Sequence, residues 1–349
     1  MSVETEPGET LAPRLDFELT SGCDHRCGHC YNVWNSKPTA GSVGYPRGAL
    51  DTESQWSMMV KALDESGAKH VTITGGEPLL RRDAVELIER LCARIPSVQL
   101  ITNGSHITPD VARRLAKAGV RSVQLTLLSA DRDRHDRLKG AVCFDDTVRA
   151  ALELREAGTQ VQCCFVSMHE NRGELSGVLE LCFVLGIRGM SYNRMSPTGW
   201  AVEEIERLLP HIEDVEADLD VANRLGPRFG IGVTTAMPIP PCLIRLERYP
   251  NVKFGFCSIG TSSPNTVIDP LGNVRACNLS STLLGNVREQ TFAEVMANPY
   301  LEAFPKSVPD VCRGCAYERS CQGGCKESGA ATFGRLDALE PFVRQGLQG

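Results

Sequence analysis

Short runs of β-branched and aliphatic residues alternate with longer amphipathic stretches over the first 195 residues of the chain. Short apolar runs of this kind predict β-strands, and apolar residues that recur every three or four positions predict helices. The predicted strands are Leu15–Leu19, His70–Thr74, Val98–Thr102, Ser122–Leu127, Gln160–Ser167 and Gly189–Tyr192. The predicted helices are Thr52–Ser66, Arg82–Arg94, Pro109–Ala118, Asp145–Ala157 and Glu174–Leu185. Six β/α units in series indicate an α/β fold with a parallel sheet, either doubly wound or curved into a partial barrel.

Polar residues and glycines mark the ends of the predicted helices. Asp51 and Thr108 precede two of them as N-cap residues, and Gly67, Gly119 and Gly158 follow three of them. In both candidate architectures, functional residues gather at the C-terminal ends of the strands. We therefore expect the site at that end of the sheet.

The composition changes along the chain and predicts its domain organisation. Residues 30–50 are rich in Gly, Pro, Ser and Asn, which indicates a long loop, and turns, short strands and cysteines dominate from residue 238 onward. The predicted parts are an N-terminal tail (1–13), an α/β core (14–200), a helical connector (201–237), a small cysteine-rich α+β domain (238–335) and a C-terminal tail (336–349).

Charge and composition exclude several classes of partner. The 349 residues carry a formal net charge of −6 with both signs interleaved, so the chain lacks the basic stripe of a nucleic-acid binder. The sequence shows no secretory signal and no run of about 18 apolar residues that would predict a membrane span. We therefore expect a cytoplasmic protein, in which the 15 cysteines stay reduced.

Three cysteines follow the first predicted strand on one loop. Cys23, Cys27 and Cys30 are separated by three and two residues, and three such thiolates can bind three irons of a cubane cluster, leaving the fourth iron open to another ligand. The alternative is a zinc site, because Cys27 and Cys30 form a common zinc half-motif. Zinc would require a second ligand pair, and the nearby His25 and His29 are awkwardly interleaved with the cysteines.

The cysteine loop and the sequence Gly75-Gly76-Glu77-Pro78 after the second predicted strand together resemble the radical S-adenosylmethionine (SAM) superfamily. The resemblance covers about residues 14–200 and implies a partial (β/α)6 TIM-type barrel with a SAM-binding [4Fe-4S] cluster. It implies that the glycines let the backbone approach the methionine moiety, that Glu77 accepts from its ammonium group and that Pro78 stiffens the turn. Without the cysteine loop, this motif would be only a tight turn.

Five further positions match softer features of the same family, and for each a cap, a turn residue or a solvated side chain is the alternative. The resemblance places Asn103 and Thr126 near the ribose, Lys139 at the SAM carboxylate, and Asn171 and His29 near the adenosine. Arginine is the usual residue at the position of Lys139. These residues complete the predicted cofactor site.

The C-terminal cysteines resemble the SPASM domain, which binds auxiliary iron–sulfur clusters. The matching positions are Cys257, Cys277, Cys312, Cys315, Cys321 and Cys325, with a predicted hairpin over Ile268–Cys277 that turns at Gly272. The resemblance implies one or two auxiliary clusters, the first held by Cys257, Cys277 and Cys325 and the second by Cys312, Cys315 and Cys321.

The chain departs from the SPASM pattern at two ligand positions. Ser262 and Ser263 stand where a ligand of the first auxiliary cluster is often found, and no cysteine follows Cys325. We expect Cys242 to replace the first missing ligand, with a buried thiol as the alternative. We find no cysteine for the second, so a non-thiol ligand completes that cluster, one of its irons is open, or the cluster is not built. A zinc ribbon of Cys312, Cys315, Cys321 and Cys325 is the alternative. Packing in the core is the expectation for the remaining thiols, Cys92, Cys143, Cys163, Cys164 and Cys182.

The resemblance implies cleavage of SAM to a 5′-deoxyadenosyl radical, hydrogen abstraction from a substrate, and a net oxidation. Our leading hypothesis is oxidative modification of a ribosomally synthesised peptide, with a crosslink or thioether as product and flavodoxin or ferredoxin as reductant. Many peptide modifiers carry an N-terminal leader-binding domain, and the first predicted strand begins near residue 14, which weakens this hypothesis: either a separate leader-binding protein supplies that function or the substrate is small.

Two alternatives remain for the function. One is dehydrogenation or epimerisation of a small polar molecule, such as an aminoglycoside or sugar, and the other is a non-catalytic metal-binding scaffold. A short precursor gene beside this one would favour the peptide. The catalytic acid, base or hydrogen donor cannot be predicted, but Tyr192, Arg194 and Met195, at the end of the sixth predicted strand, are expected to line the cavity.

Overall fold

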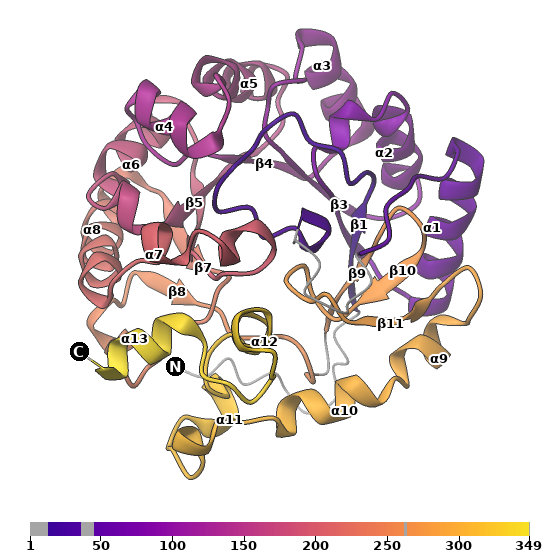
Figure 1. Cartoon of the computed structure of the whole chain (residues 1–349). Coiled ribbons are helices and arrows are strands. Elements are labelled where there is room, and N and C mark those ends of the chain that lie inside the picture. Colours follow the sequence, from indigo (N-terminus) through magenta and orange to yellow (C-terminus); the bar gives the residue numbers. More distant parts are fainter. Residues whose placement is uncertain (1–12, 36–44, 262–263, 349) are drawn as a thin grey trace.

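A computed structural model describes residues 13–35, 45–261 and 264–348 and shows a single curved sheet wrapped by helices (Figure 1). The sheet has eleven strands in the order β11-β10-β9-β1-β2-β3-β4-β5-β6-β7-β8, and β1 to β9 run parallel. The strands are β1 Arg14–Glu18, β2 His70–Thr74, β3 Ser97–Thr102, β4 Ser122–Thr126, β5 Val161–Ser167, β6 Gly189–Arg194, β7 Gly232–Thr235, β8 Val252–Phe254, β9 Asn265–Ile268, β10 Asn273–Arg275 and β11 Leu283–Asn286. The predicted partial TIM-type barrel is confirmed.

The helices that follow β1 to β6 pack on the outside of the sheet, and their ends follow the predicted caps. The Asp51 side chain accepts from the amides of Glu53 and Ser54 at the start of α1, and Gly67 ends that helix with a left-handed φ of 67°. The α-helices are α1 Thr52–Ser66, α2 Ala84–Cys92, α3 Pro109–Ala118, α4 Arg132–Lys139, α5 Phe144–Glu156, α6 Leu175–Val184, α7 Ile205–Leu208, α8 Ile212–Phe229, α9 Phe292–Met296, α10 Pro299–Lys306, α11 Glu318–Cys321, α12 Lys326–Phe333 and α13 Pro341–Gln348.

The parallel sheet extends further along the chain than the six predicted strands. Residues 201–237 were expected to form a helical connector, and they contain α7 and α8 but also β7, which pairs with β6. β8 then adds a further parallel strand at the same edge. The periodicity of α8 was visible in the sequence, whereas β7 has only four residues and gave no separate signal.

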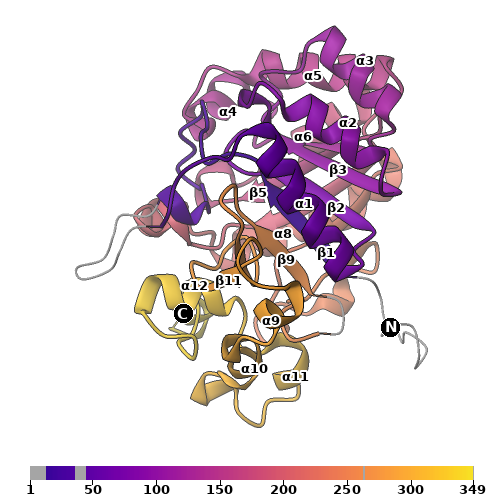
Figure 2. The same cartoon turned by 90° about the vertical axis from the view of Figure 1, so that its right-hand side faces the viewer.

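The cysteine-rich part of the chain joins the opposite edge of the barrel. β9 pairs with β1 in parallel, and β9 and β10 form the predicted hairpin, with Gly272 in the turn at a φ of 89°. The helices α9 to α13 lie together on one side of the barrel, as two perpendicular views show (Figures 1 and 2). The predicted C-terminal tail contains α13, and Phe342 is fully buried, so this segment is part of the packed structure.

Two buried ion pairs connect the barrel to these C-terminal segments. Arg275 on β10 pairs with Glu18 on β1, and Arg194 on β6 pairs with Glu340 just before α13. All four side chains are at most 2% exposed, so neither charge of a pair has water as an alternative partner. In the part of the chain that the structure describes, no helix is long and apolar enough to span a bilayer.

Candidate functional site

The loop that carries Cys23, Cys27 and Cys30 crosses the C-terminal ends of the barrel strands. It begins after β1 and leads into the 3-10 turn Val33–Asn35. Its first contact is with the Gly75–Glu77 segment after β2, where the Gly76 amide donates to Thr20 O and the Glu77 amide donates to Gly22 O, both at 2.8 Å. The loop is therefore hydrogen-bonded to the end of the neighbouring strand.

The two glycines are required by this close approach. A Cβ on Gly75 would lie 2.5 Å from Thr20 O, and a Cβ on Gly76 would lie 2.1 Å from Gly22 O. Distances this short exclude any side chain unless the backbone moves. The predicted approach of these glycines to SAM stays a prediction, and the structure supplies a second reason for them: they admit the cysteine loop.

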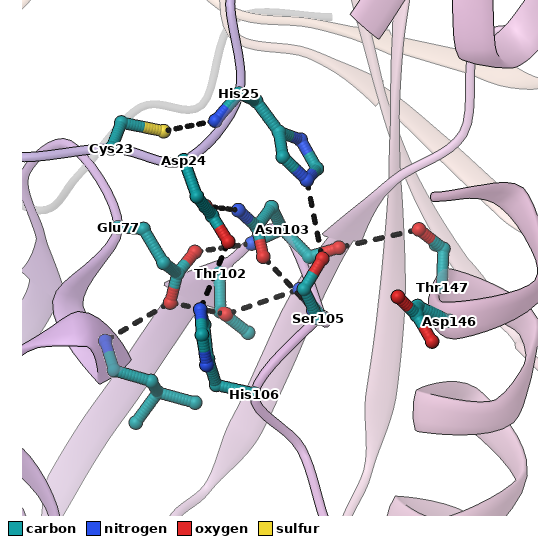
Figure 3. A network of polar contacts seen from close by, with 12 residues as sticks. Cys23, Asp24, His25, Glu77, Thr102, Asn103, Ser105, His106, Asp146 and Thr147 are labelled. Atoms are coloured by element: carbon teal, nitrogen blue, oxygen red, sulfur yellow. Dashed lines mark hydrogen bonds and ion pairs between the residues drawn. The ribbon is translucent and has the colours of Figure 1, made fainter. Parts of the chain in front are cut away.

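Glu77 joins the ends of β2 and β3 to the cysteine loop (Figure 3). Its buried carboxylate accepts from Thr102 Oγ1 at 2.7 Å and from the amide of Asn103 at 2.7 Å. Asn103 Nδ2 in turn donates to Asp24 of the loop, also at 2.7 Å. Burial raises the pKa of Glu77, and the hydrogen bonds from Asn103 and Thr102 oppose that shift.

The same region fixes the two residues that follow Cys23. Asp24 Oδ2 lies 2.9 Å from His106 Nε2, and His25 Nε2 lies 3.1 Å from Ser105 Oγ. Burial lowers the pKa of His25 to about 4, so its ring is neutral at physiological pH. The imidazole is held by Ser105, and it acts here as a positioning group for the loop.

Two further contacts hold the second half of the loop. The Arg26 amide donates to Lys139 O at 3.2 Å, and a Cβ on the adjacent Gly140 would lie 2.4 Å from Arg26 O. After the third cysteine, the Ala201 amide donates to Cys30 O at 3.2 Å. The loop is thus anchored at β2, β3, α4 and the segment after β6, which fixes where its thiols can be.

The placement of the thiols bears on the choice between a cluster and a single zinc ion. Thiolates bound tetrahedrally to one zinc lie about 3.8 Å apart, given a zinc–sulfur bond of about 2.3 Å. Among the described residues, the only three-residue group with ligand atoms within 4.8 Å of one another is His135, Asp136 and Cys143. Cys23, Cys27 and Cys30 do not form such a group, so their sulfur atoms are not gathered around one point as a single zinc ion would require.

Lys139 and His29 have polar atoms whose placement the fold alone does not explain. Lys139 is 4% exposed, and its ammonium has no hydrogen-bond or ion-pair partner among the described residues, although it lies near enough to Cys27 to interact with its charge. His29 Nδ1 is buried without a partner, and burial lowers the pKa of this ring to about 3. A buried ammonium group and an imidazole nitrogen with a free hydrogen-bonding position suit a cofactor that offers a carboxylate and further polar groups, as SAM does.

The other predicted cofactor residues differ in how far their side chains are already engaged. Thr126 is half-buried at the end of β4 and lies directly opposite Cys164 on β5, so the two side chains are on the same face of the sheet. Asn171 is fully buried, and its amide bonds to the backbone of Met168, Leu128 and Val166. The turn-residue alternative thus describes Asn171, while its predicted contact with adenosine stays untested. Asn103, similarly, already bonds to Asp24.

Tyr192 does not line the cavity as expected, whereas the same expectation for Arg194 and Met195 stays a prediction. All three are at most 2% exposed, and the Tyr192 hydroxyl donates to Asp218 on α8, outside the sheet. Because side chains alternate along a strand, the inner face of β6 is formed by its half-buried polar neighbours, including Asn193. Asn193 was not among the predicted residues, although the alternation of apolar Met190 and Tyr192 with polar Ser191 and Asn193 was a signal for it in the sequence.

The C-terminal thiols form two groups. Cys277 lies near enough to Cys257 and Cys325 for their charges to interact, as the resemblance implied for the first auxiliary cluster. The buried Glu327 also interacts electrostatically with Cys257 and Cys277. Ser262 and Ser263 lie outside the described residues.

Cys242 belongs to the other group, which corrects the expectation that it completes the first. It lines one pocket together with Cys312, Cys315 and Cys321, and Cys325 is not part of that lining. Cys325 lies near Cys277 instead, which does not favour the alternative of a zinc ribbon that uses Cys325 together with Cys312, Cys315 and Cys321.

The remaining thiols are placed as expected for packing, with one qualification. Cys143, Cys163, Cys164 and Cys182 are buried and Cys92 is half-buried. Cys164 accepts a 3.5 Å contact from Asn193 Nδ2, so it faces the inside of the barrel rather than its helical layer.

Comparison with known proteins agrees with both cysteine-containing parts. The chain matches the Radical SAM superfamily over residues 17–182 and the SPASM iron–sulfur cluster-binding domain over residues 257–316. It therefore belongs to the radical SAM enzymes that carry a SPASM domain. Its cofactors are the SAM-binding [4Fe-4S] cluster, SAM and auxiliary iron–sulfur clusters.

Among its relatives is the PqqA peptide cyclase of Granulibacter bethesdensis, with 25% identity over 95% of this chain and 87% of the relative. The AdoMet-dependent heme synthase of Methanosarcina barkeri is 26% identical over 95% of this chain and 97% of the relative. Streptococcus suis SuiB, in a crystal structure with its precursor peptide SuiA, shares the fold with a TM-score of 0.71 and 18% identity, over 96% of this chain and 76% of SuiB.

Proposed function

We propose that this radical SAM enzyme oxidatively modifies a ribosomally synthesised peptide, forming a crosslink, a thioether or a similar bond. The carrying observation is the combination of a three-thiol loop over the barrel mouth with a second, cysteine-rich part packed on the same barrel. Similarity to the PqqA peptide cyclase over nearly the whole chain supports a peptide as substrate.

The chemistry of the cofactor sets the reaction type. When bound, the cluster and SAM supply a 5′-deoxyadenosyl radical, which removes a hydrogen atom from the substrate. The substrate then loses a second electron and a proton, so that one new bond replaces two bonds to hydrogen. The auxiliary thiols fit this proposal because an oxidation of the substrate radical requires an electron acceptor within the protein.

The residues of this chain would hold the cofactor as follows. Cys23, Cys27 and Cys30 would bind the cluster, and the Lys139 ammonium, which has no partner among the described residues, would bind the SAM carboxylate. His29, whose Nδ1 lacks a partner, would contact the adenosine. Glu77 would accept from the SAM ammonium with a carboxylate that already organises β2 and β3.

The proposed partners are a flavodoxin or ferredoxin as reductant and a separate leader-binding protein. The cytoplasm is the proposed compartment, because the iron–sulfur ligands must stay reduced.

The test is co-expression with a short precursor peptide encoded beside the gene, followed by mass spectrometry of the peptide. The expected product is lighter than the precursor by two hydrogens, and one equivalent of 5′-deoxyadenosine should form per modified peptide. The matched control replaces Cys23, Cys27 and Cys30 by Ala, which should abolish both products. An unmodified precursor beside undiminished SAM cleavage would refute the peptide assignment.

A second candidate is oxidation of a small molecule, which the similarity to the heme synthase favours. Its test is the same reconstituted enzyme with candidate small substrates. Product formation that is saturable in a small molecule, with no change in any precursor peptide, would select this candidate.

A further inference from the structure

Four thiols from two distant parts of the sequence meet at one pocket. Three come from the short segment around α11, and the fourth, Cys242, precedes them by 70 residues. The pocket is lined by Pro240, Pro241, Cys242, Cys312, Cys315, Tyr317, Glu318, Cys321, Gly323 and Val343. Apart from Glu318, these residues contribute thiol groups or mainly apolar surface to the pocket. Such a lining suits a soft metal cluster better than a hydrated ion.

The electrostatic neighbours of each thiol agree with this grouping. Cys312 lies near enough to Cys321, Cys242 and Cys315 for their charges to interact, and Cys242 interacts in the same way with Cys315. Neither Cys257 nor Cys277 is among the neighbours of Cys242. Cys242 therefore has its thiol partners in one group only.

The backbone holds Cys242 in place before any ligand is present. The buried residues Ile239 and Ile244 flank it on both sides, and the amides of Leu243 and Ile244 donate to Pro240 O at 3.1 Å. Arg194 Nε donates to Pro238 O at 3.0 Å, which connects this loop to the end of β6. A thiol on such an anchored loop is preorganised for a ligand.

The placement of the four thiols bears on the kind of ligand that they bind. In the described part of the chain, none of these four cysteines belongs to a three-residue group with ligand atoms within 4.8 Å of one another. Sulfurs around a single tetrahedral zinc would meet that limit, because they lie about 3.8 Å apart. The four thiols line one pocket, but no three of them are gathered around one point as a single zinc ion would require.

We propose that Cys242 is the fourth thiolate ligand of the second auxiliary iron–sulfur cluster, together with Cys312, Cys315 and Cys321. This assignment makes the second cluster fully cysteine-ligated. It also leaves Cys257, Cys277 and Cys325 as a three-thiolate set among the described residues, so an open or non-cysteine-ligated iron belongs to the first auxiliary cluster.

The test separates the two clusters by background substitutions in anaerobically reconstituted full-length protein. C257A/C277A removes the first auxiliary cluster and C312A/C315A removes the second, so each background should hold about eight irons instead of the about twelve of three cubanes. C242A is then added to each background. The control is C92A, which removes a half-buried thiol of α2 from the same backgrounds.

The expected result is asymmetric. In the C257A/C277A background, adding C242A should lower the iron content toward about four per chain or change the EPR spectrum of the remaining auxiliary cluster. In the C312A/C315A background, C242A should change neither measurement. The reverse asymmetry, or no effect of C242A in either background, would overturn the assignment, as would stoichiometric zinc in the wild-type protein measured by mass spectrometry of the metals.

A second measurement covers the case in which the double variants do not fold. The single variants C242A, C312A and C257A are then compared by EPR after reduction with dithionite. We expect C242A and C312A to alter the same signal and C257A to alter a different one. An altered signal shared by C242A and C257A, or an unaltered spectrum in C242A, would contradict the proposal.

Discussion

The substitution Gly76→Ala tests whether the glycine pair exists to admit the cysteine loop. Gly76 has no left-handed φ, so the substitution introduces a steric conflict without backbone strain. The new Cβ would lie 2.1 Å from Gly22 O and 2.6 Å from Gly22 C, and a backbone cannot yield to this contact without moving. The loop must therefore separate from the end of β2.

The cost follows from the bonds that this movement breaks. The Gly76 amide loses Thr20 O, and the Glu77 amide loses Gly22 O, both now at 2.8 Å. At about 0.5–1.5 kcal/mol net for each bond, docking of the loop weakens by about 1–3 kcal/mol. That corresponds to roughly 5- to 150-fold in the fraction of correctly docked loop. The apolar core does not contact the new methyl group, so the melting temperature should change little.

The assay measures iron at the N-terminal cluster, SAM affinity and 5′-deoxyadenosine formation separately. We expect Gly76→Ala to lose iron from this cluster and to form deoxyadenosine roughly 5- to 150-fold more slowly. The matched control is Gly119→Ala, at a φ of 86° with nothing within 4 Å of the new Cβ. It should cost about 1–2 kcal/mol of global stability and leave the cluster intact. Full iron content with lost SAM affinity in the Gly76 variant would refute the reasoning, because the glycine would then serve SAM and not the loop.

Three further changes should have separable effects. Arg194→Met leaves Glu340 buried and unpaired, and urea unfolding should show a loss of about 3–5 kcal/mol, whereas Arg335→Met in an exposed pair should cost at most about 1 kcal/mol. Lys139→Met should weaken SAM binding in equilibrium dialysis by roughly 10- to 150-fold, and Lys139→Arg should restore most of it; equal affinity in both variants would exclude the proposed carboxylate contact. Burial raises the pKa of Asp218 from its ordinary value of 3.8 to about 7, so the folded chain keeps a proton that the unfolded chain releases, and stability should fall as the pH rises between those two values. Asp218→Asn should flatten that part of the stability curve, and an unchanged slope would show that other groups cause it.

Local sequence determined most of the barrel. The strands β1 to β6 and helices such as α1 lie within one or two residues of their predicted ends, because period and capping residues act over short distances. The three-thiol loop and the glycine motif were likewise evident, since each depends on residues adjacent in sequence. The four residues of β7 were missed because so short a strand carries too little periodicity.

Tertiary structure decided the contacts between distant segments. Whether Tyr192 points into the barrel or toward α8 depends on which face of β6 packs against that helix. The partners of Arg194 and Arg275 lie 146 and 257 residues away in the sequence. The group to which Cys242 belongs was invisible for the same reason, since spacing fixes which thiols share a loop and only packing fixes which loops meet. Backbone preferences depend on residues that are close in sequence, so the sequence alone predicts them. The sulfur atoms around one cluster come from distant segments, so only the folding of the whole sheet brings them together.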